Sequence, residues 1–389
     1  FYLSYCEFSC FLGEYHSQKG FDIVETQFDK VFFQSGILVR ANEIVKFRYN
    51  CMIEYYTAKR AAEEPQFLND LLTNQKYIHF PNEILYYTGL NRRSLDVLKA
   101  VQTDLRRYYT QIGSVTEELN NYQIEVDISL PEEVFSQKLE QGRLTQEESD
   151  ELSDVRSSAD PENAEIIDKS KEINEGSAFA QTLQIFGNCI KNLEFIDIEE
   201  KHEAFCDYLL GLSIILALMK QGAEMNCEQE IKEMLEAPEE YSDKDIEELK
   251  RITNDFIKIA LPICIQNIAL DNIGTIKLKS TYEAVMRSND ATPFYRFFST
   301  FILCDLRVPG VGDIIKNYLA GITDKSLLKI AFFKLMYYYQ LRYFDGEFDH
   351  ILESELSNIN LKLNGQPKFA KSEVIKQLRA SRIPQEKIK

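Results

Sequence analysis

Apolar residues spaced three and four positions apart constrain the fold of this 389-residue chain more than any other feature. That spacing places apolar side chains on one face of an α-helix, and it extends through most of the sequence outside residues 126–177. The chain holds only 16 Gly and 10 Pro, which argues against a turn-rich all-β fold. We therefore expect a mainly α fold, in which a short β-hairpin precedes an irregular helical array.

Two short runs of alternating residues, ILVR and IVKFRY, interrupt the helical pattern near the start of the chain. Asn42 lies between them and tolerates the left-handed conformation that a tight hairpin needs. From Asn50 the apolar period changes from 2 to 3.6, so the second run leads directly into a helix. Helices are also predicted over residues 1–20, ending at Gly20, and from an N-cap at Asp22. This order of elements predicts the tail of a winged-helix domain.

Composition divides the chain into four expected parts. Residues 131–176 carry 14 acidic and 5 basic residues, a local charge of −9 that is half of the chain's −18. Such a segment has too little apolar content to form a core. The predicted parts are a winged-helix remnant (1–62), a helical linker domain (63–125), an acidic connector (126–177) and a helical array domain (178–389).

The helical array contains strongly apolar segments that we interpret as buried helices. The longest, Leu209–Met219, is shorter than the roughly 20 residues of a membrane span, and Asp207 and Lys220 flank it. Residues 325–344 are apolar nearly all round and predict a central helix. Pro262 should kink or break the helix that contains it.

The net charge and the cysteine pattern limit which binding partners and which cellular compartment we expect for this chain. A net charge of −18 disfavours binding to nucleic acid or to anionic lipid, which need a positive surface. The eight cysteines are scattered without a CxxC motif, which indicates reduced and mostly buried thiols. No secretory signal is visible. We expect a cytoplasmic protein without membrane attachment.

Catalytic motifs are absent from the sequence, and we expect no enzyme activity, bound cofactor or metal in this chain. No P-loop occurs, and the Gly-rich segment 308–316 is best interpreted as a turn before a helix. His202 and Cys206 share one helix face and could form a thiol–imidazole or metal pair. The simpler interpretation is a buried thiol beside a half-exposed imidazole.

Basic residues offer candidate contacts with a partner. Arg92, Arg93, Arg106 and Arg107 decorate one side of a predicted helix, where Asp96 and Asp104 would balance them in a purely solvated face. Residues 362–389 hold eight Lys/Arg and two Glu, either as a solvated end or as a nucleic-acid contact. Tyrosine clusters such as Tyr86–Tyr87 are typical both of interfaces and of core edges.

The segment GILVRANEIVKFRYNCMIEYYTAKRAA resembles the end of the winged-helix domain in STAND NTPases of the NACHT type. In that family a hairpin leads into a helix carrying Glu-Tyr-Phe-x-Ala-(Lys/Arg). The residues that match the family pattern are Gly36, Ile37, Leu38, Phe47, Arg48, Glu54, Tyr55, Ala58 and Lys59. Animal NACHT proteins usually have His at the position of Tyr49. Residues 178–212 are also similar to a helical segment of bacterial antiphage (Avs-like) STAND proteins.

This resemblance implies that the chain is the carboxy-terminal part of a multidomain STAND NTPase. Phe47, Arg48, Tyr49, Glu54 and Tyr55 would then form a structural relay between the winged helix and the NTPase. The helical part would sense a ligand, often a foreign protein, and release homo-oligomerisation. ATP and magnesium would belong to the upstream NTPase domain. The alternative is a free-standing helical scaffold or adaptor.

Overall fold

The computed structural model describes residues 3–20, 30–115, 118–119, 121–126, 174–234, 243–344 and 346–382. The predicted N-cap at Asp22 and most of the acidic connector lie outside the described residues. The described part is mainly helical with one small sheet, so the predicted fold class is confirmed. The chain forms two compact units, Phe1–Val97 with Leu144–Gln181 (unit 1) and Leu98–Arg143 with Thr182–Lys389 (unit 2).

Unit 1 begins with a three-stranded antiparallel sheet of order β1-β3-β2. Its first elements are β1 (Leu3–Ser4), α1 (Tyr5–Lys19), β2 (Leu38–Ala41) and β3 (Ile44–Phe47). Leu38 pairs with Phe47 and Ala41 with Ile44, and the two residues between have φ values of 49° and 67°. Two left-handed residues define the tight turn of a β-hairpin. The hairpin predicted around Asn42 is therefore confirmed.

The strand β1 is an addition that the sequence did not indicate. Its two residues pair with β3 and are followed at once by α1. Ser4 caps α1, because its hydroxyl accepts a hydrogen bond from the Glu7 amide while the Glu7 carboxylate accepts one from the Ser4 amide. The helix ends at Gly20, whose φ is 66°, as predicted.

The core of this sheet region is small. Phe8, Leu38 and Val45 are its buried residues. Phe33 meets Phe8 edge-to-face with ring centroids 6.0 Å apart. Other apolar side chains pack around these residues but stay partly exposed.

A cluster of short helices completes the described amino-terminal part of unit 1. These are α3 (Asn50–Glu63), α4 (Pro65–Leu72), η1 (Thr73–His79) and α5 (Pro81–Leu90). Pro65 and Pro81 occupy the first position of their helices, where a missing N–H costs nothing. Ala58 and Ala61 are buried on α3, which packs against α4 and α5. As predicted, β3 leads directly into a helix.

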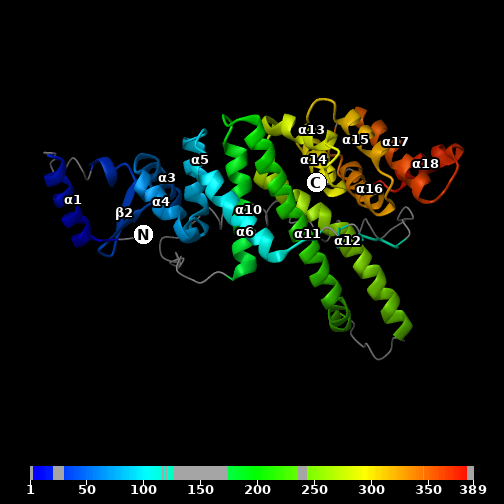
Figure 1. The fold of residues 1–389 in the computed structure, drawn as a ribbon, viewed down its shortest axis with the longest axis horizontal. Coiled ribbons are helices and arrows are strands. Elements are labelled where there is room, and N and C mark those ends of the chain that lie inside the picture. Colours follow the sequence, from blue (N-terminus) through cyan, green and yellow to red (C-terminus); the bar gives the residue numbers. More distant parts are fainter. Residues whose placement is uncertain are drawn as a thin grey trace. The chain divides into compact units, whose positions relative to one another are not determined.

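Unit 2 is built on long helices. They are α6 (Asp96–Ile112), α10 (Glu175–Asn192), α11 (Ile198–Met234) and α12 (Asp243–Ile273), of which α6 and α10 each start in unit 1. Figure 1 shows α11 and α12 lying side by side over much of their length. Of the kink or break expected at Pro262, the break does not occur, because α12 continues past this residue to Ile273. Burial of Ile259, Ile265 and Ala269 on the same helix offsets the local cost of the proline.

Within the described residues, two helices are long and apolar enough to span a membrane by length and composition alone, Ile198–Met225 and Ile246–Ile273. In these two windows, 56% and 39% of the residues are buried inside the protein. Buried core helices meet the same criterion, so these two segments are weak evidence for a membrane.

The rest of unit 2 is a stack of shorter helices around α16. Its elements are η3 (Ile276–Leu278), α13 (Lys279–Arg287), α14 (Pro293–Asp305), α15 (Val311–Gly321), α16 (Lys325–Gln340), α17 (Gly346–Leu363), η4 (Lys368–Ala370) and α18 (Lys371–Ala380). Most residues of α16 are buried, which confirms the predicted central helix. Gly310, with φ of 85°, starts α15, so the Gly-rich segment is the predicted turn before a helix.

Candidate functional site

The junction of β3 and α3 holds the predicted relay residues. The Arg48 amide donates a hydrogen bond to the carbonyl of Ile37 (3.0 Å), which closes the base of the hairpin. Gly36 allows this closure, because its φ is +73° and a Cβ there would lie 2.8 Å from Arg48 Nη1. The Arg48 guanidinium carbon lies 5.5 Å from the centre of the Tyr49 ring. Arg48 therefore fixes the geometry of the hairpin as it enters α3.

Glu54 connects α3 to α5. One of its carboxylate oxygens accepts a hydrogen bond from the side-chain amide of Asn82 (2.8 Å). Tyr55, the next residue, meets Tyr86 of α5 edge-to-face at 6.3 Å. Two adjacent residues of α3 thus make one polar and one aromatic contact with α5.

A continuous row of aromatic rings follows this junction, and we call Phe47, Tyr55, Tyr56 and Tyr86 the aromatic strip. Ring centroids are 5.8 Å apart for Phe47 and Tyr56 and 5.5 Å apart for Tyr55 and Tyr56. The exposed fractions of Tyr55, Tyr56 and Tyr86 are 40%, 45% and 37%. Three large aromatic side chains therefore remain open to solvent on α3 and α5, and Tyr49 nearby is also exposed.

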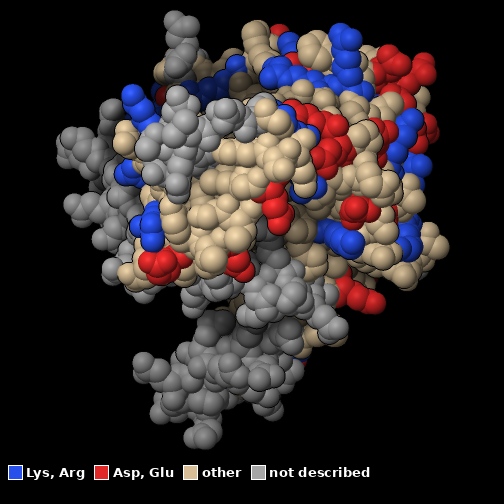
Figure 2. All heavy atoms as spheres, turned by 90° about the vertical axis from the view of Figure 1, so that its left-hand side faces the viewer, with Lys and Arg blue, Asp and Glu red and all other residues tan. Residues whose placement is uncertain are grey.

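Other apolar side chains of unit 1 are exposed as well. Phe11 and Tyr15 of α1 stack with their ring centroids 6.0 Å apart, and both are exposed. Figure 2 looks at the molecule from the side of α1 and shows uncharged side chains gathered between acidic and basic ones. Exposed aromatic groups near charged rims are typical of protein-binding surfaces.

The four arginines predicted as partner contacts do not form one free basic face. Arg92 and Arg93 belong to unit 1 and are exposed, with the Arg92 Nε–H donating to the Gly89 carbonyl (3.2 Å). Arg106 in unit 2 is bound by two carboxylates of α11, Glu203 (2.6 Å) and Asp207 (2.6 Å).

The acidic residues of α11 balance the charge of α6. The hydrogen bond to Glu203 is the main reason that the pKa of Arg106 is raised, so this arginine stays charged and engaged. Lys99 pairs with Glu200 (3.1 Å), and Arg107 pairs with Asp104 of its own helix (3.4 Å). These contacts favour a packing role for α6 over contact with a polyanion.

His202 and Cys206 meet as their spacing predicts, with Nε2 and Sγ 3.7 Å apart. Burial, together with the nearby Asp207 carboxylate, raises the pKa of the Cys206 thiol. A nucleophilic cysteine needs a lowered pKa, so this pair is not an activated thiolate. Within the described residues, no three His, Cys, Asp or Glu side chains are placed to hold a metal ion.

The prediction that the cysteines are mostly buried is wrong. Among the seven described cysteines, Cys189 and Cys304 are buried and Cys206 is half-buried. Cys6, Cys10, Cys51 and Cys264 are exposed, and all seven are free thiols.

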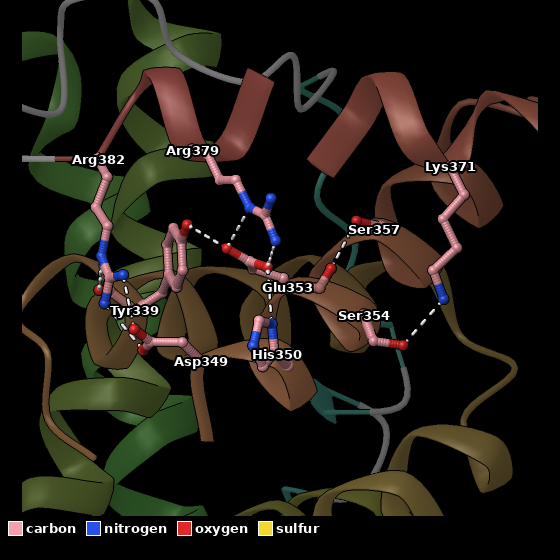
Figure 3. Close-up of polar contacts among 9 residues, drawn as sticks. All are labelled: Tyr339, Asp349, His350, Glu353, Ser354, Ser357, Lys371, Arg379 and Arg382. Carbon is pink, nitrogen blue, oxygen red and sulfur yellow. Dashed lines mark hydrogen bonds and ion pairs between the residues drawn. The ribbon is translucent and has the colours of Figure 1, made fainter. Parts of the chain in front are cut away.

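The described part of the basic carboxy-terminal segment, residues 362–382, is bound to the body of unit 2 through several of its charged side chains. Figure 3 shows Glu353 of α17 accepting hydrogen bonds from the Tyr339 hydroxyl (3.0 Å) and from Nε (2.9 Å) and Nη2 (2.7 Å) of Arg379. Arg382 forms a two-pronged ion pair with Asp349 (2.7 and 2.9 Å). Its guanidinium carbon also lies 4.3 Å from the centre of the Tyr339 ring.

We call this group of residues (Tyr339, Asp349, Glu353, Arg379 and Arg382) the carboxy-terminal clasp. The hydrogen bonds from Arg379 are the main cause that holds the pKa of Glu353 below its ordinary range. Because these side chains satisfy one another, the clasp fixes α18 against α16 and α17. Lys371 adds hydrogen bonds to Ser354 (2.9 Å) and Asn358 (2.9 Å).

Sequence reasoning missed a second polar group, which lies in the core of unit 2. Lys334 of α16 is 1% exposed and forms an ion pair with Asp305 of α14 (3.2 Å). The Asp305 carboxylate also accepts hydrogen bonds from Gln266 (2.7 Å) and Tyr338 (2.7 Å). Burial lowers the pKa of Lys334. The one available signal was a lysine inside the apolar run AFFKLMYYY.

Comparison with known proteins assigns only the amino-terminal region. Residues 1–57 match the family described as "Novel STAND NTPase 4". The matched segment includes the sheet of unit 1 and the start of α3. No curated protein and no solved structure matches the chain. The family match supports a relationship to STAND NTPases, through the part of the chain that contains the β3–α3 junction.

Proposed function

We propose that this chain is the regulatory and ligand-sensing region of a STAND-type NTPase. The observation that carries the proposal is the family match over residues 1–57, which ends inside α3 just after the β3–α3 junction. In this proposal residues 1–62 are the end of the winged-helix domain. The chain would be the carboxy-terminal portion of a NACHT-type protein of the antiphage (Avs-like) kind.

The aromatic strip would contact the NTPase domain of the same protein. Its tyrosines are 37–45% exposed, and tyrosine side chains are common anchors at protein interfaces. Arg48 and Glu54 are held by Ile37 and Asn82, so the strip has a fixed backbone beneath it. Such a rigid junction suits the transmission of a domain movement.

Unit 2 would bind the activating ligand, which we propose is a foreign protein. Arrays of helices present long surfaces suited to protein recognition. Ligand binding would release the NTPase for nucleotide exchange and homo-oligomerisation, with ATP and magnesium held upstream. The chain itself would carry out no catalysis and would act in the cytoplasm.

The reading frame that encodes this chain gives the first test. The proposal expects a P-loop, G-x4-G-K-[ST], in the polypeptide upstream of residue 1. A frame that lacks any nucleotide-binding module would contradict it and favour the free-standing adaptor.

Partner binding is tested by mixing the encoded protein with a panel of phage structural proteins. We expect one of them to co-elute in gel filtration and to raise the rate of ATP hydrolysis. A Tyr55→Ala variant should keep binding but lose most of the rate increase, whereas Tyr15→Ala on α1 serves as the matched exposed control. Equal responses of both variants would contradict the role of the aromatic strip.

A further inference from the structure

A cavity of about 410 Å³ lies in unit 2 between α13, α14, α15 and the start of α16. Its volume falls within the range of about 300–1,000 Å³ that is usual for small-molecule sites. Much of its wall is apolar, with Met286, Ile314 and Leu327 among the residues that line it. This cavity is distinct from the aromatic strip and from the carboxy-terminal clasp.

Arg296 is the first polar feature of this cavity. Its Nη2 donates a hydrogen bond to the Ser288 carbonyl (2.8 Å), which holds the half-buried guanidinium in place. Its Nε–H is buried and has no hydrogen-bond partner within the described part of the chain. A buried donor without an acceptor is unfavourable, so this group favours a ligand that supplies one.

Tyr318 is the second polar feature. The residue is 8% exposed, and its ring packs edge-to-face on Phe301 with centroids 5.8 Å apart. Its hydroxyl is buried and also finds no partner among the described residues. Burial raises the pKa of Tyr318 while the charge of Arg296 opposes that shift. The phenol is therefore a neutral donor close enough to Arg296 to feel its charge.

The acidic residues of the wall are already engaged. Glu283 pairs with Arg287 (3.0 Å) and with Lys279 (3.8 Å). The Asp324 carboxylate accepts a hydrogen bond from the Leu327 amide (2.8 Å) and so caps α16. Among the described lining residues, this leaves Arg296 as the cation without a carboxylate partner.

We propose that the cavity binds a carboxylate that carries an apolar body. The Arg296 Nε–H and the Tyr318 O–H would donate to the carboxylate, and the apolar wall would cover the body. One unpaired arginine matches one negative charge, whereas a phosphate dianion is normally held by more donors. Such a carboxylate occurs in two sources, a free apolar acid and the terminal carboxylate of a polypeptide.

Two probes distinguish these sources, 3-phenylpropionate as the free acid and the peptide N-acetyl-Gly-Gly-Leu as the chain end. Their binding to the whole chain is measured by titration calorimetry, with the methyl ester of each as the uncharged control. We expect saturable binding of at least one acid and no binding of the esters. Tighter binding of the peptide assigns the site to a polypeptide end, and tighter binding of 3-phenylpropionate assigns it to a free acid.

Two variants locate the binding. Gly321 lines the cavity, and a Cβ there would meet no atom within 4 Å, so we expect Gly321→Phe to place its ring in this space and occupy part of the cavity. We expect Gly321→Phe and Arg296→Leu each to weaken binding at least tenfold. Arg251→Leu removes the same charge from an exposed, paired arginine of α12 that does not line the cavity, and it should weaken binding less than threefold.

The proposal is overturned if neither acid binds, or if the esters bind as well as the acids. It is also overturned if Gly321→Phe leaves the affinity unchanged or if Arg251→Leu weakens binding as much as Arg296→Leu does. Circular dichroism of each variant tests whether the fold is retained. If Arg296→Leu fails to fold, Gly321→Phe alone decides.

Discussion

The core of unit 2 and the aromatic strip of unit 1 differ in how fully they bury large side chains. In unit 1 the sheet core rests on Phe8, Leu38 and Val45, while the tyrosines of the aromatic strip are 37–45% exposed. Unit 2 also exposes rings such as Phe256, but its core buries Phe297 fully and even an ion pair, with Lys334 1% exposed. The comparison therefore sets a buried core that contains a charged pair against one exposed aromatic surface.

We expect the largest effect on stability from a substitution in the core of unit 2. Lys334→Met removes one member of the buried pair and leaves Asp305 charged in the interior. We expect a loss of about 3–5 kcal/mol in the free energy of unfolding. The chain contains no Trp, so urea unfolding is followed by far-ultraviolet circular dichroism.

A double substitution that removes both charges of the buried pair is the control for this loss of stability. Lys334→Met combined with Asp305→Asn should recover at least half of the lost stability, since no uncompensated charge remains. Arg251→Met breaks an exposed pair with Glu248 and should cost far less stability than Lys334→Met. Equal losses for the buried and exposed pairs would contradict the contrast between core and surface.

We expect the second-largest loss of stability from a substitution in the carboxy-terminal clasp. Glu353→Gln weakens charged hydrogen bonds to Arg379, which we expect to cost about 2 kcal/mol at pH 7. The pKa of Glu353 is lower in the folded chain than in the unfolded one, so its contribution is complete above the unfolded pKa of about 4.3. It disappears as the pH falls through the folded pKa.

Urea midpoints at pH 7 and pH 3 measure this linkage. The chain with Glu353 should lose more stability between these two values than the Glu353→Gln variant does. Glu248→Gln, on a fully exposed pair, is the matched control and should leave the pH dependence nearly unchanged. A pH dependence that is identical with and without Glu353 would show that the clasp does not link folding to protonation.

Sequence reasoning succeeded where the determining contacts are local. The hairpin around Asn42 and the start of α3 at Asn50 follow from turn residues and a change of period within about ten residues. It failed where the contacts are distant. Arg379 finds its carboxylate 26 positions away on α17, so charge counting alone suggested a solvated tail.

Pro262 and the aromatic strip show two further limits. A proline inside a helix does destabilise it locally, but the burial of apolar side chains along α12 outweighs this cost. The resemblance predicted that Tyr55 of α3 belongs to a structural relay, and in the structure its ring meets those of Tyr56 and Tyr86. Their exposure depends on what else covers that face, which no helical pattern records.

Gly36→Ala tests the hairpin of unit 1, where we expect a smaller loss of stability. The residue has φ of +73°, and its Cβ would press on Arg48 Nη1. We expect a loss of about 1 kcal/mol, since an alanine in the left-handed region carries roughly that penalty. Gly89→Ala, inside α5 with open space at its Cβ position, should be neutral or slightly stabilising in the same urea experiment. If Gly89→Ala destabilised the chain more than Gly36→Ala, the left-handed backbone at Gly36 would not be the strained position.

The smallest effect bears most directly on the contrast between the units. Tyr55→Ala removes a ring that is 40% exposed and meets two other exposed rings, so the isolated chain should lose no more than about 1 kcal/mol of stability. Phe301→Ala in unit 2, whose ring is fully buried, should cost about 3–5 kcal/mol under the same conditions. A large loss for Tyr55→Ala would mean that the aromatic strip stabilises unit 1 itself. A small loss would mean that the fold of unit 1 does not depend on the exposed ring of Tyr55, which leaves this surface available to a partner.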